Sequence, residues 1–195
     1  LGPVGVDRLD VTFDFNPTVD RIRVTCNRDY NYRLNPITGA IAFTDINLNY
    51  AVADVNAGAN PYIATGAYTN SYVGSTSTVL YNVDALLKIV AKQDPPNNGT
   101  LNTIGSLGGA VSKSFSSADM DIFYDAVSQT NKTYLTVNSN LEADRLITVD
   151  LTTGVGTLVT TNIGGGLYID DIACFIDRSY PDLIGNLMYA LNTNN

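Results

Sequence analysis

A β-hairpin is encoded by the segment Leu146-Ile147-Thr148-Val149-Asp150-Leu151-Thr152-Thr153-Gly154-Val155-Gly156-Thr157-Leu158. Asp150 ends the first apolar strand with a side chain that can hydrogen-bond the turn backbone, and Gly154 tolerates the positive φ that a tight turn needs. A close copy occurs at residues 32–41 and a looser one at 79–90. The repeated pattern predicts a chain built from β-hairpins.

Each hairpin follows an earlier apolar strand, and a fourth such strand lies near the C-terminus. These inner strands are residues 10–15, 62–68, 120–125 and 169–175. The unit of inner strand, second strand and hairpin recurs at roughly 45–65 residues, which is the span of a four-stranded propeller blade. The sequence therefore predicts one all-β, β-propeller-like domain over residues 1–195, with about four blades.

Three predicted blades are nearly complete, at about residues 10–49, 60–108 and 118–163. The fourth is incomplete and holds only the strand at 169–175 and a second strand at 187–191. A sheet that lacks its outer strands exposes unpaired backbone groups, which invite pairing with another chain. We therefore expect self-association through edge strands.

Composition excludes several function classes. The chain has 195 residues, a formal net charge of −8, a pI near 4.2, and neither histidine nor tryptophan. An acidic chain lacks the basic face that nucleic-acid binding needs. The absence of histidine removes Ser-His-Asp and Cys-His catalysis and histidine-based metal sites. No apolar run is long enough to span a bilayer as a helix.

The residue usage indicates a compartment. Glu142 is the single glutamate among 19 acidic residues, lysines are scarce, and Asn, Thr and Tyr are abundant, as in many secreted and cell-surface β-proteins. Cys26 and Cys174 are either two free thiols or one disulfide, the latter favoured by an extracellular setting. Asn98 and Asn131 begin N-x-S/T triplets, which are weak signals in a chain of this composition. These features favour an extracellular or cell-surface location.

Several short motifs keep their order along residues 4–166. They include Val4-Gly5-Val6-Asp7, Phe13-Asp14-Phe15-Asn16-Pro17, Asp20-Arg21-Ile22-Arg23-Val24, Ala53-Asp54-Val55-Asn56-Ala57-Gly58, Ala67-Tyr68-Thr69-Asn70-Ser71 and Gly105-Ser106-Leu107-Gly108. This set resembles a domain-of-unknown-function family of secreted bacterial proteins. The resemblance implies an extracellular propeller-like repeat domain, and it transfers no catalytic residue because the family has no assigned activity.

One departure from that family concerns the order of segments. Its members usually begin with a segment similar to residues 187–192 and a further blade before the Phe-Asn-Pro signature. Here that segment stands at the C-terminus. We expect either a permuted slice of a tandem array or a subunit whose terminal strands complete a neighbour.

Aspartates cluster on the inner strands. Alternating carboxylates on several such strands of a propeller converge on the central channel, where they can coordinate Ca²⁺ together with backbone carbonyls. The candidate calcium ligands are Asp121, Asp125, Asp170 and Asp171. The alternative is that these aspartates cap turns and lie on solvated edges. No segment has the D-x-[DN]-x-[DN]-G spacing of a calcium loop, and no other cofactor is indicated.

A second charged pattern is Asp20, Arg21 and Arg23 on one strand, with Arg33 on the next. It predicts a cross-strand network of aspartate and arginine.

The sequence leaves three functional hypotheses. The first is a non-enzymatic extracellular structural or interaction module, such as a filament subunit joined by β-strand complementation between chains. The second is a calcium-stabilised propeller that binds a ligand, such as a glycan or surface partner, at the channel mouth. The third is a carboxylate-based glycan hydrolase, disfavoured because no tryptophan can stack on sugar rings. We expect no enzymatic activity.

Overall fold

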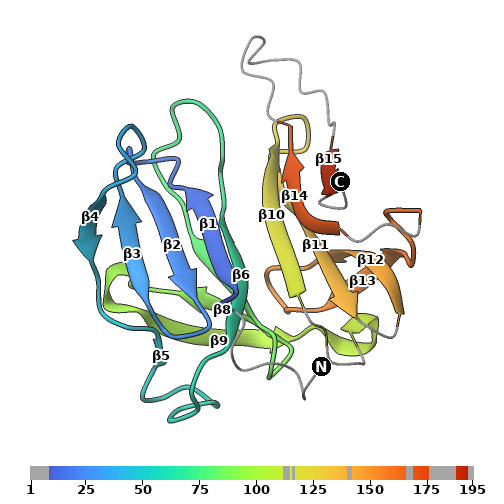
Figure 1. Ribbon diagram of the computed structural model, residues 1–195, viewed down its shortest axis with the longest axis horizontal. Coiled ribbons are helices and arrows are strands. Elements are labelled where there is room, and N and C mark those ends of the chain that lie inside the picture. The colour runs from blue at the N-terminus through green and yellow to red at the C-terminus, as the bar shows by residue number, and fades with distance from the viewer. Residues whose placement is uncertain are drawn as a thin grey trace.

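The computed structural model describes residues 9–111, 115, 117–139, 142–165, 169–175 and 188–192. These residues form β-strands and two short 3₁₀ helices, with no α-helix among them (Figure 1). The strands lie in four separate sheets, none of which closes on itself. The all-β prediction is confirmed. No helix in the described ranges is long and apolar enough to cross a bilayer.

Two of the sheets are four-stranded antiparallel meanders. Sheet 1 contains β1 (Val11–Phe15), β2 (Ile22–Cys26), β3 (Asn31–Leu34) and β4 (Ile41–Thr44) in that order. Sheet 3 contains β10 (Ser117–Asp125), β11 (Thr130–Ser139), β12 (Glu142–Val149) and β13 (Gly156–Thr160), also in chain order. In each sheet the first strand is an edge strand, so its outer N–H groups need partners outside the sheet.

Sheet 2 has an additional strand from the preceding segment. Its order is β5 (Asn49–Tyr50), β9 (Thr100–Ser106), β8 (Ile89–Gln93), β7 (Leu80–Asp84) and β6 (Ile63–Tyr68). The short β5 runs parallel to β9, and the Asn49 N–H donates to the Gly99 carbonyl at 2.9 Å. The predicted first unit, residues 10–49, was therefore wrong at its end, because Leu48 and Tyr50 pack in a cluster with Leu101.

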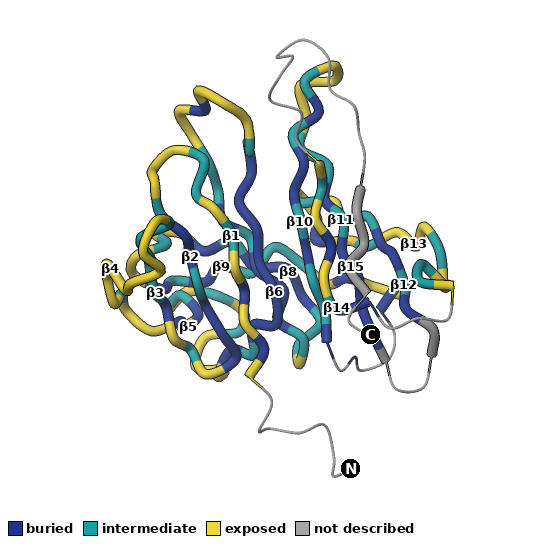
Figure 2. Tube along the Cα trace, turned by 45° about the horizontal axis from the view of Figure 1, so that its top comes forward, coloured by how far each residue is buried: buried dark blue, intermediate teal, exposed yellow. Residues whose placement is uncertain are grey.

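Sheet 4 pairs β14 (Ile169–Cys174) with β15 (Met188–Asn192) in antiparallel register. The C-terminal strand thus pairs within its own chain. Along the chain, β1 packs against β6, β6 against β10, and β10 against β14. In both views β6 and β10 lie between β1 and β14 (Figures 1 and 2).

Four hairpins use the same turn chemistry. Asn35, Asp84, Asp125 and Asp150 each end a strand and accept a hydrogen bond from the backbone N–H two residues later, at 2.7 to 3.1 Å. Four residues after each of them the backbone has positive φ: 69° at Gly39, 55° at Lys88, 55° at Gln129 and 79° at Gly154. The hairpin predictions at 32–41, 79–90 and 146–158 are confirmed.

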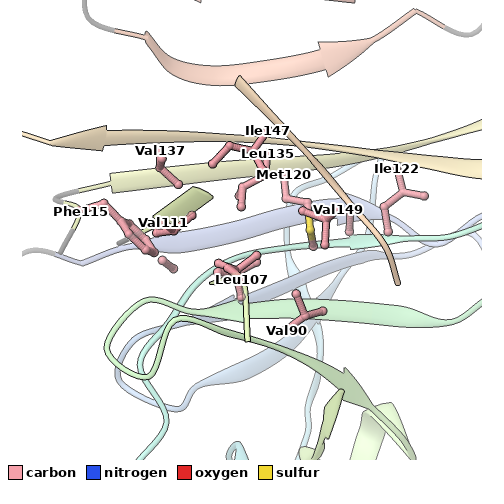
Figure 3. Close-up of a cluster of buried hydrophobic side chains, with 13 residues drawn as sticks. Val90, Leu107, Val111, Phe115, Met120, Ile122, Leu135, Val137, Ile147 and Val149 are labelled. Carbon is pink, nitrogen blue, oxygen red and sulfur yellow. The ribbon is translucent and has the colours of Figure 1, made fainter. Parts of the chain in front are cut away.

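The main core lies between sheets 2 and 3. Its buried side chains include Val83 and Val90 from sheet 2 and Met120, Leu135 and Ile147 from sheet 3 (Figure 3). Alternate residues of each sheet-3 strand supply these side chains, as the pleat requires. At one border of this interface β9 meets the β12–β13 turn so closely that a Cβ on Gly105 would overlap the Thr153 carbonyl, and a Cβ on Gly154 would overlap the Gly105 carbonyl.

Sheets 1 and 2 are joined by polar contacts around Arg23. Its side chain is 3% exposed and donates to Asn31 Oδ1 at 2.8 Å, Asp45 Oδ2 at 2.6 Å and Asn97 Oδ1 at 2.8 Å. Arg23 Nε also donates to the Tyr68 hydroxyl of β6 at 3.2 Å. One buried guanidinium thus connects β2, β3, the loop after β4, η1 (Pro96–Asn98) and β6.

The predicted arginine network exists, but its acid is Asp45. Arg33 binds both Asp45 oxygens at 2.8 Å, while Arg21 bonds the Asp20 carbonyl and not a carboxylate. Burial acts to raise the pKa of Asp45, but the hydrogen bonds from Arg33 and Arg23 hold it below its usual value. The prediction of Asp20 was wrong because sequence spacing does not show which loop folds back over a strand.

Cys26 and Cys174 are both free thiols, on β2 and β14. The structure therefore shows two free thiols and no disulfide between these two residues.

Replacing Arg23 by alanine tests the polar joint between sheets 1 and 2. The change leaves the amide oxygens of Asn31 and Asn97 without the Arg23 donor and leaves Asp45 paired with Arg33 alone, which costs about 2–4 kcal/mol. We expect the melting temperature to fall by roughly 10 °C. The exposed Arg28→Ala variant is the control and should melt within about 1 °C of the unmodified chain. Equal melting temperatures of the two variants would show that the network contributes nothing to stability.

Candidate functional site

The inner strands β1, β6, β10 and β14 are linked by hydrogen bonds from side chains to main chain. On β1, Asp14 Oδ2 accepts the Tyr68 N–H of β6 at 2.6 Å. On β6, Thr65 Oγ1 accepts the Met120 N–H of β10 at 2.8 Å. A side-chain acceptor on one inner strand thus binds a main-chain N–H group on the edge of the next inner strand.

The same arrangement continues twice from β10 to β14. Asp119 Oδ2 accepts the Ile172 N–H at 2.9 Å, and Asp121 Oδ2 accepts the Cys174 N–H at 2.6 Å. Asp119 Oδ1 also accepts the Thr65 hydroxyl at 3.1 Å. The four bonds to main-chain N–H groups run in one direction along the chain, with the acceptor on one inner strand and the donor on its successor. They satisfy edge N–H groups that would otherwise be buried without a partner.

Burial changes the acidity of these carboxyls. It raises the pKa of Asp14 to about 7 despite the hydrogen bond from Tyr68. The pKa of Asp119 is raised to about 8 by burial and then by a hydrogen bond shared with Asp171. Burial also raises the pKa of Asp121 and of the Cys174 thiol. Each of Asp14 and Asp119 therefore changes its protonation state near neutral pH.

A groove of about 650 Å³ lies beside these strands. Its walls are residues 14–21, from β1 and the following turn, and residues 71–74, with Asp121 from β10. Tyr72 stacks on Tyr124 with ring centroids 4.5 Å apart, next to that wall. The groove offers carboxyls, the Arg21 guanidinium and an aromatic surface. These groups suit a polar, uncharged ligand better than an anion, because the lining has three carboxyl side chains and one guanidinium.

The structure separates the four predicted calcium ligands. Asp121 and Asp171 lie on adjacent inner strands, and the charge of Asp171 contributes to the raised pKa of Asp121. Asp125 lies at the β10–β11 turn, where Lys132 Nζ approaches its carboxylate at 2.5 Å and Ser128 donates to it at 2.8 Å. The pKa of Asp125 falls to about 2, mainly because of Lys132. Asp170 lies on β14 and, together with burial, raises the pKa of Asp144.

No three acidic, cysteine or histidine side chains gather into a group suited to a metal ion within the described ranges. The carboxylates of Asp121 and Asp125 already accept hydrogen bonds, so Ca²⁺ would have to displace their donors. The calcium ligand set stays a prediction. Asp177, an acidic residue three positions after the end of β14, lies outside the described residues.

Sequence reasoning missed the role of Thr65 and of Asp14 as acceptors between strands. A signal was present, because Thr12-Phe13-Asp14-Phe15 and Asp119-Met120-Asp121-Ile122 both alternate polar and apolar residues. The two glycosylation triplets also differ. Asn98 is exposed, whereas Asn131 exchanges hydrogen bonds with Asn70 through both atoms of its amide.

Stability should fall as pH rises through the titration range of Asp14. Its folded pKa of about 7 exceeds its ordinary value of 3.8, so the folded state binds more protons between these values. The stabilisation is complete below pH 3.8 and is lost as the pH rises past about 7. We expect Asp14→Asn to reduce the drop in melting temperature between pH 5 and pH 8.5 by roughly 5 °C.

Differential scanning calorimetry at several pH values measures this effect. Asp150→Asn is the matched control, because the Thr152 N–H lowers the pKa of Asp150 and its titration lies below the range scanned. Its melting temperature should change equally at both pH values. An Asp14→Asn profile parallel to that of the unmodified chain would contradict the assignment.

No curated protein matches this chain. A family model described as a domain of unknown function (DUF4394) matches residues 5–173. The match covers all the strands from β1 to β13 and most of β14, including every inner-strand acceptor described above. The chain therefore belongs to the DUF4394 family of domains of unknown function.

Proposed function

We propose that this chain is an extracellular, non-enzymatic structural or interaction module with a propeller-like arrangement, and that it assembles with copies of itself. The observation that carries the proposal is the series of inner strands β1, β6, β10 and β14, which pack in chain order. β1, β6 and β10 each start a four-stranded meander, as the inner strand of a propeller blade does, and β14 starts a pair with β15. Among the described strands the series ends at β1 and at β14, and an inner strand without a further neighbour favours association with another sheet.

The chemistry of the inner strands supports a non-enzymatic role. Asp14, Asp119 and Asp121 each accept a hydrogen bond from a main-chain N–H group of the next inner strand. These aspartates hold strands together, so the hydrolase hypothesis has no free carboxylate pair to rest on among them.

The extracellular location rests on composition and on exposure. Lysine and glutamate are scarce, and Asn98 of the N-x-S/T triplet is exposed at the end of η1. A surface asparagine in this setting can carry a glycan without disturbing the fold.

The alternative is a calcium-stabilised propeller that binds a glycan or surface partner. The groove bounded by residues 14–21 and 71–74, with its carboxyls and tyrosines, is the observation that favours it.

A calcium titration separates the two functions. If Ca²⁺ binds the folded chain, the melting temperature rises with Ca²⁺ concentration and returns when EDTA is added. Asp171→Asn should abolish the rise. The structural-module proposal expects equal melting temperatures in calcium and in EDTA, since the inner-strand carboxylates already have donors.

Self-association is tested on the unmodified chain by sedimentation velocity over a wide concentration range and by electron microscopy. We expect species larger than a monomer whose share grows with concentration, and ordered assemblies in the images. A monodisperse monomer at every concentration would contradict the assembly proposal.

A further inference from the structure

The two faces of sheet 1 differ in chemistry. Thr12, Asp14 and Arg23 lie on the face toward sheet 2, where Asp14 and Arg23 bond to β6. The opposite face, here called the outer face of sheet 1, carries Val11, Phe13 and Phe15 of β1, with Val24 of β2 and Ile41 of β4 in register beside them.

The outer face of sheet 1 is partly covered. Ile22 and Cys26 of β2, which pair with Phe15 and Val11, are buried, whereas the side chains on β1 and β4 are exposed. Val11 is 45% exposed, Phe13 58%, Phe15 56% and Ile41 59%. Figure 2 shows exposed positions along β1, between β2 and β6. A contiguous exposed apolar patch of this kind marks an interaction surface.

The β10 face of sheet 3 has the same residue pattern as the outer face of sheet 1, and it shows which kind of surface such a face packs against. In β10, Ala118, Met120 and Ile122 alternate with Asp119 and Asp121, as the apolar residues of β1 alternate with Thr12 and Asp14. Met120 and Ile122 are 3% and 1% exposed, because this face of sheet 3 packs on sheet 2 (Figure 3). The outer face of sheet 1 thus has the pattern of a face that packs on a preceding inner strand and its sheet.

The other end of the series offers the matching side. On β14, Ile169 and Ile172 are buried, whereas Asp171 and Ala173 are exposed, and the exposed Asp171 carboxyl also hydrogen-bonds Asp119 of β10. Asp171 holds the position on β14 that Asp119 holds on β10. Asp119 comes one residue before Met120, whose N–H binds Thr65 of β6, and Asp171 comes one residue before Ile172, whose N–H binds Asp119 of β10. We call the side with Asp171 and Ala173 the forward side of β14.

Backbone geometry supplies the donor. The Asn27 N–H donates to the Asp10 carbonyl and the Asn16 N–H to the Arg21 carbonyl, which makes even-numbered residues of β1 the hydrogen-bonded partners of β2. The N–H of Phe13 therefore points away from β2. Phe13 corresponds to Met120, whose N–H binds Thr65 of the preceding inner strand.

We propose that the outer face of sheet 1 binds the forward side of β14 from a second copy of this chain, with Asp171 of one copy accepting the Phe13 N–H of the next. This contact repeats the internal interface between β6 and β10. Because each copy has both sides and β6 and β10 lie between them, the contact is head-to-tail and adds copies in one direction. The inference rests on the proposed function. It assigns the contact between two copies to the packing of the faces of their inner strands.

Two single variants block one side each. Phe13→Asp puts a carboxylate on the outer face of sheet 1, and Ala173→Arg puts a long charged side chain on the forward side of β14. Both positions are exposed, so both variants should fold, as circular dichroism and melting curves check. Val11→Asp is a second variant of the outer face. The controls are Ile37→Asp, 87% exposed in the β3–β4 turn, and Val127→Arg, 83% exposed in the β10–β11 turn.

Sedimentation velocity gives the readout at a concentration where the unmodified chain is mostly assembled. We expect each single variant to sediment as a monomer and both controls to assemble like the unmodified chain. An equimolar mixture of Phe13→Asp and Ala173→Arg keeps one intact copy of each side, so it should form a dimer and nothing larger.

The outcomes separate the two proposals. Assembly of the single variants at the level of the unmodified chain, or a mixture that stays monomeric, would overturn this interface while leaving self-association in place. An unmodified chain that is monomeric at every concentration would remove both. Loss of assembly in the controls would show that any added charge disperses the copies, which also contradicts the specific contact.

Discussion

The arrangement of the sheets depends on hydrogen bonds from side chains of one inner strand to the N–H groups of the next. An edge strand that is covered by protein must find acceptors for its outward N–H groups. Asp14, Thr65, Asp119 and Asp121 are these acceptors. Their positions fix the register between neighbouring sheets, so the spacing of polar residues along an inner strand determines how the next sheet is placed.

This use of carboxylates has an energetic consequence. Burial raises the pKa of Asp14 to about 7 and that of Asp119 to about 8, because a charged oxygen loses hydration that one or two N–H groups do not fully replace. The hydroxyl of Thr65 performs the same task without a charge. The balance between carboxylate and hydroxyl acceptors therefore sets how strongly the joints between sheets depend on pH.

The joints between sheets are of two kinds. Sheets 2 and 3 share an apolar core, whereas sheets 1 and 2 meet through the buried Arg23 and its oxygen partners. A polar joint on one side of sheet 1 leaves its apolar residues on the other side. Phe13 and Phe15 stay exposed for that reason. The chain therefore has a buried core between sheets 2 and 3. On sheet 1 it has an exposed face with the residue pattern of a buried face.

The sequence by itself determined the strands, the hairpins and their turns, because period-two alternation and an Asx residue four positions before a positive-φ residue act within a few residues of chain. It also indicated the inner-strand aspartates, without their roles. Only the tertiary structure decided that β5 joins the second sheet, that Asp45 serves Arg23, that Asp125 caps a turn, and which face of sheet 1 is covered. Each of these depends on contacts between segments far apart in the chain, and local spacing does not specify which segments meet.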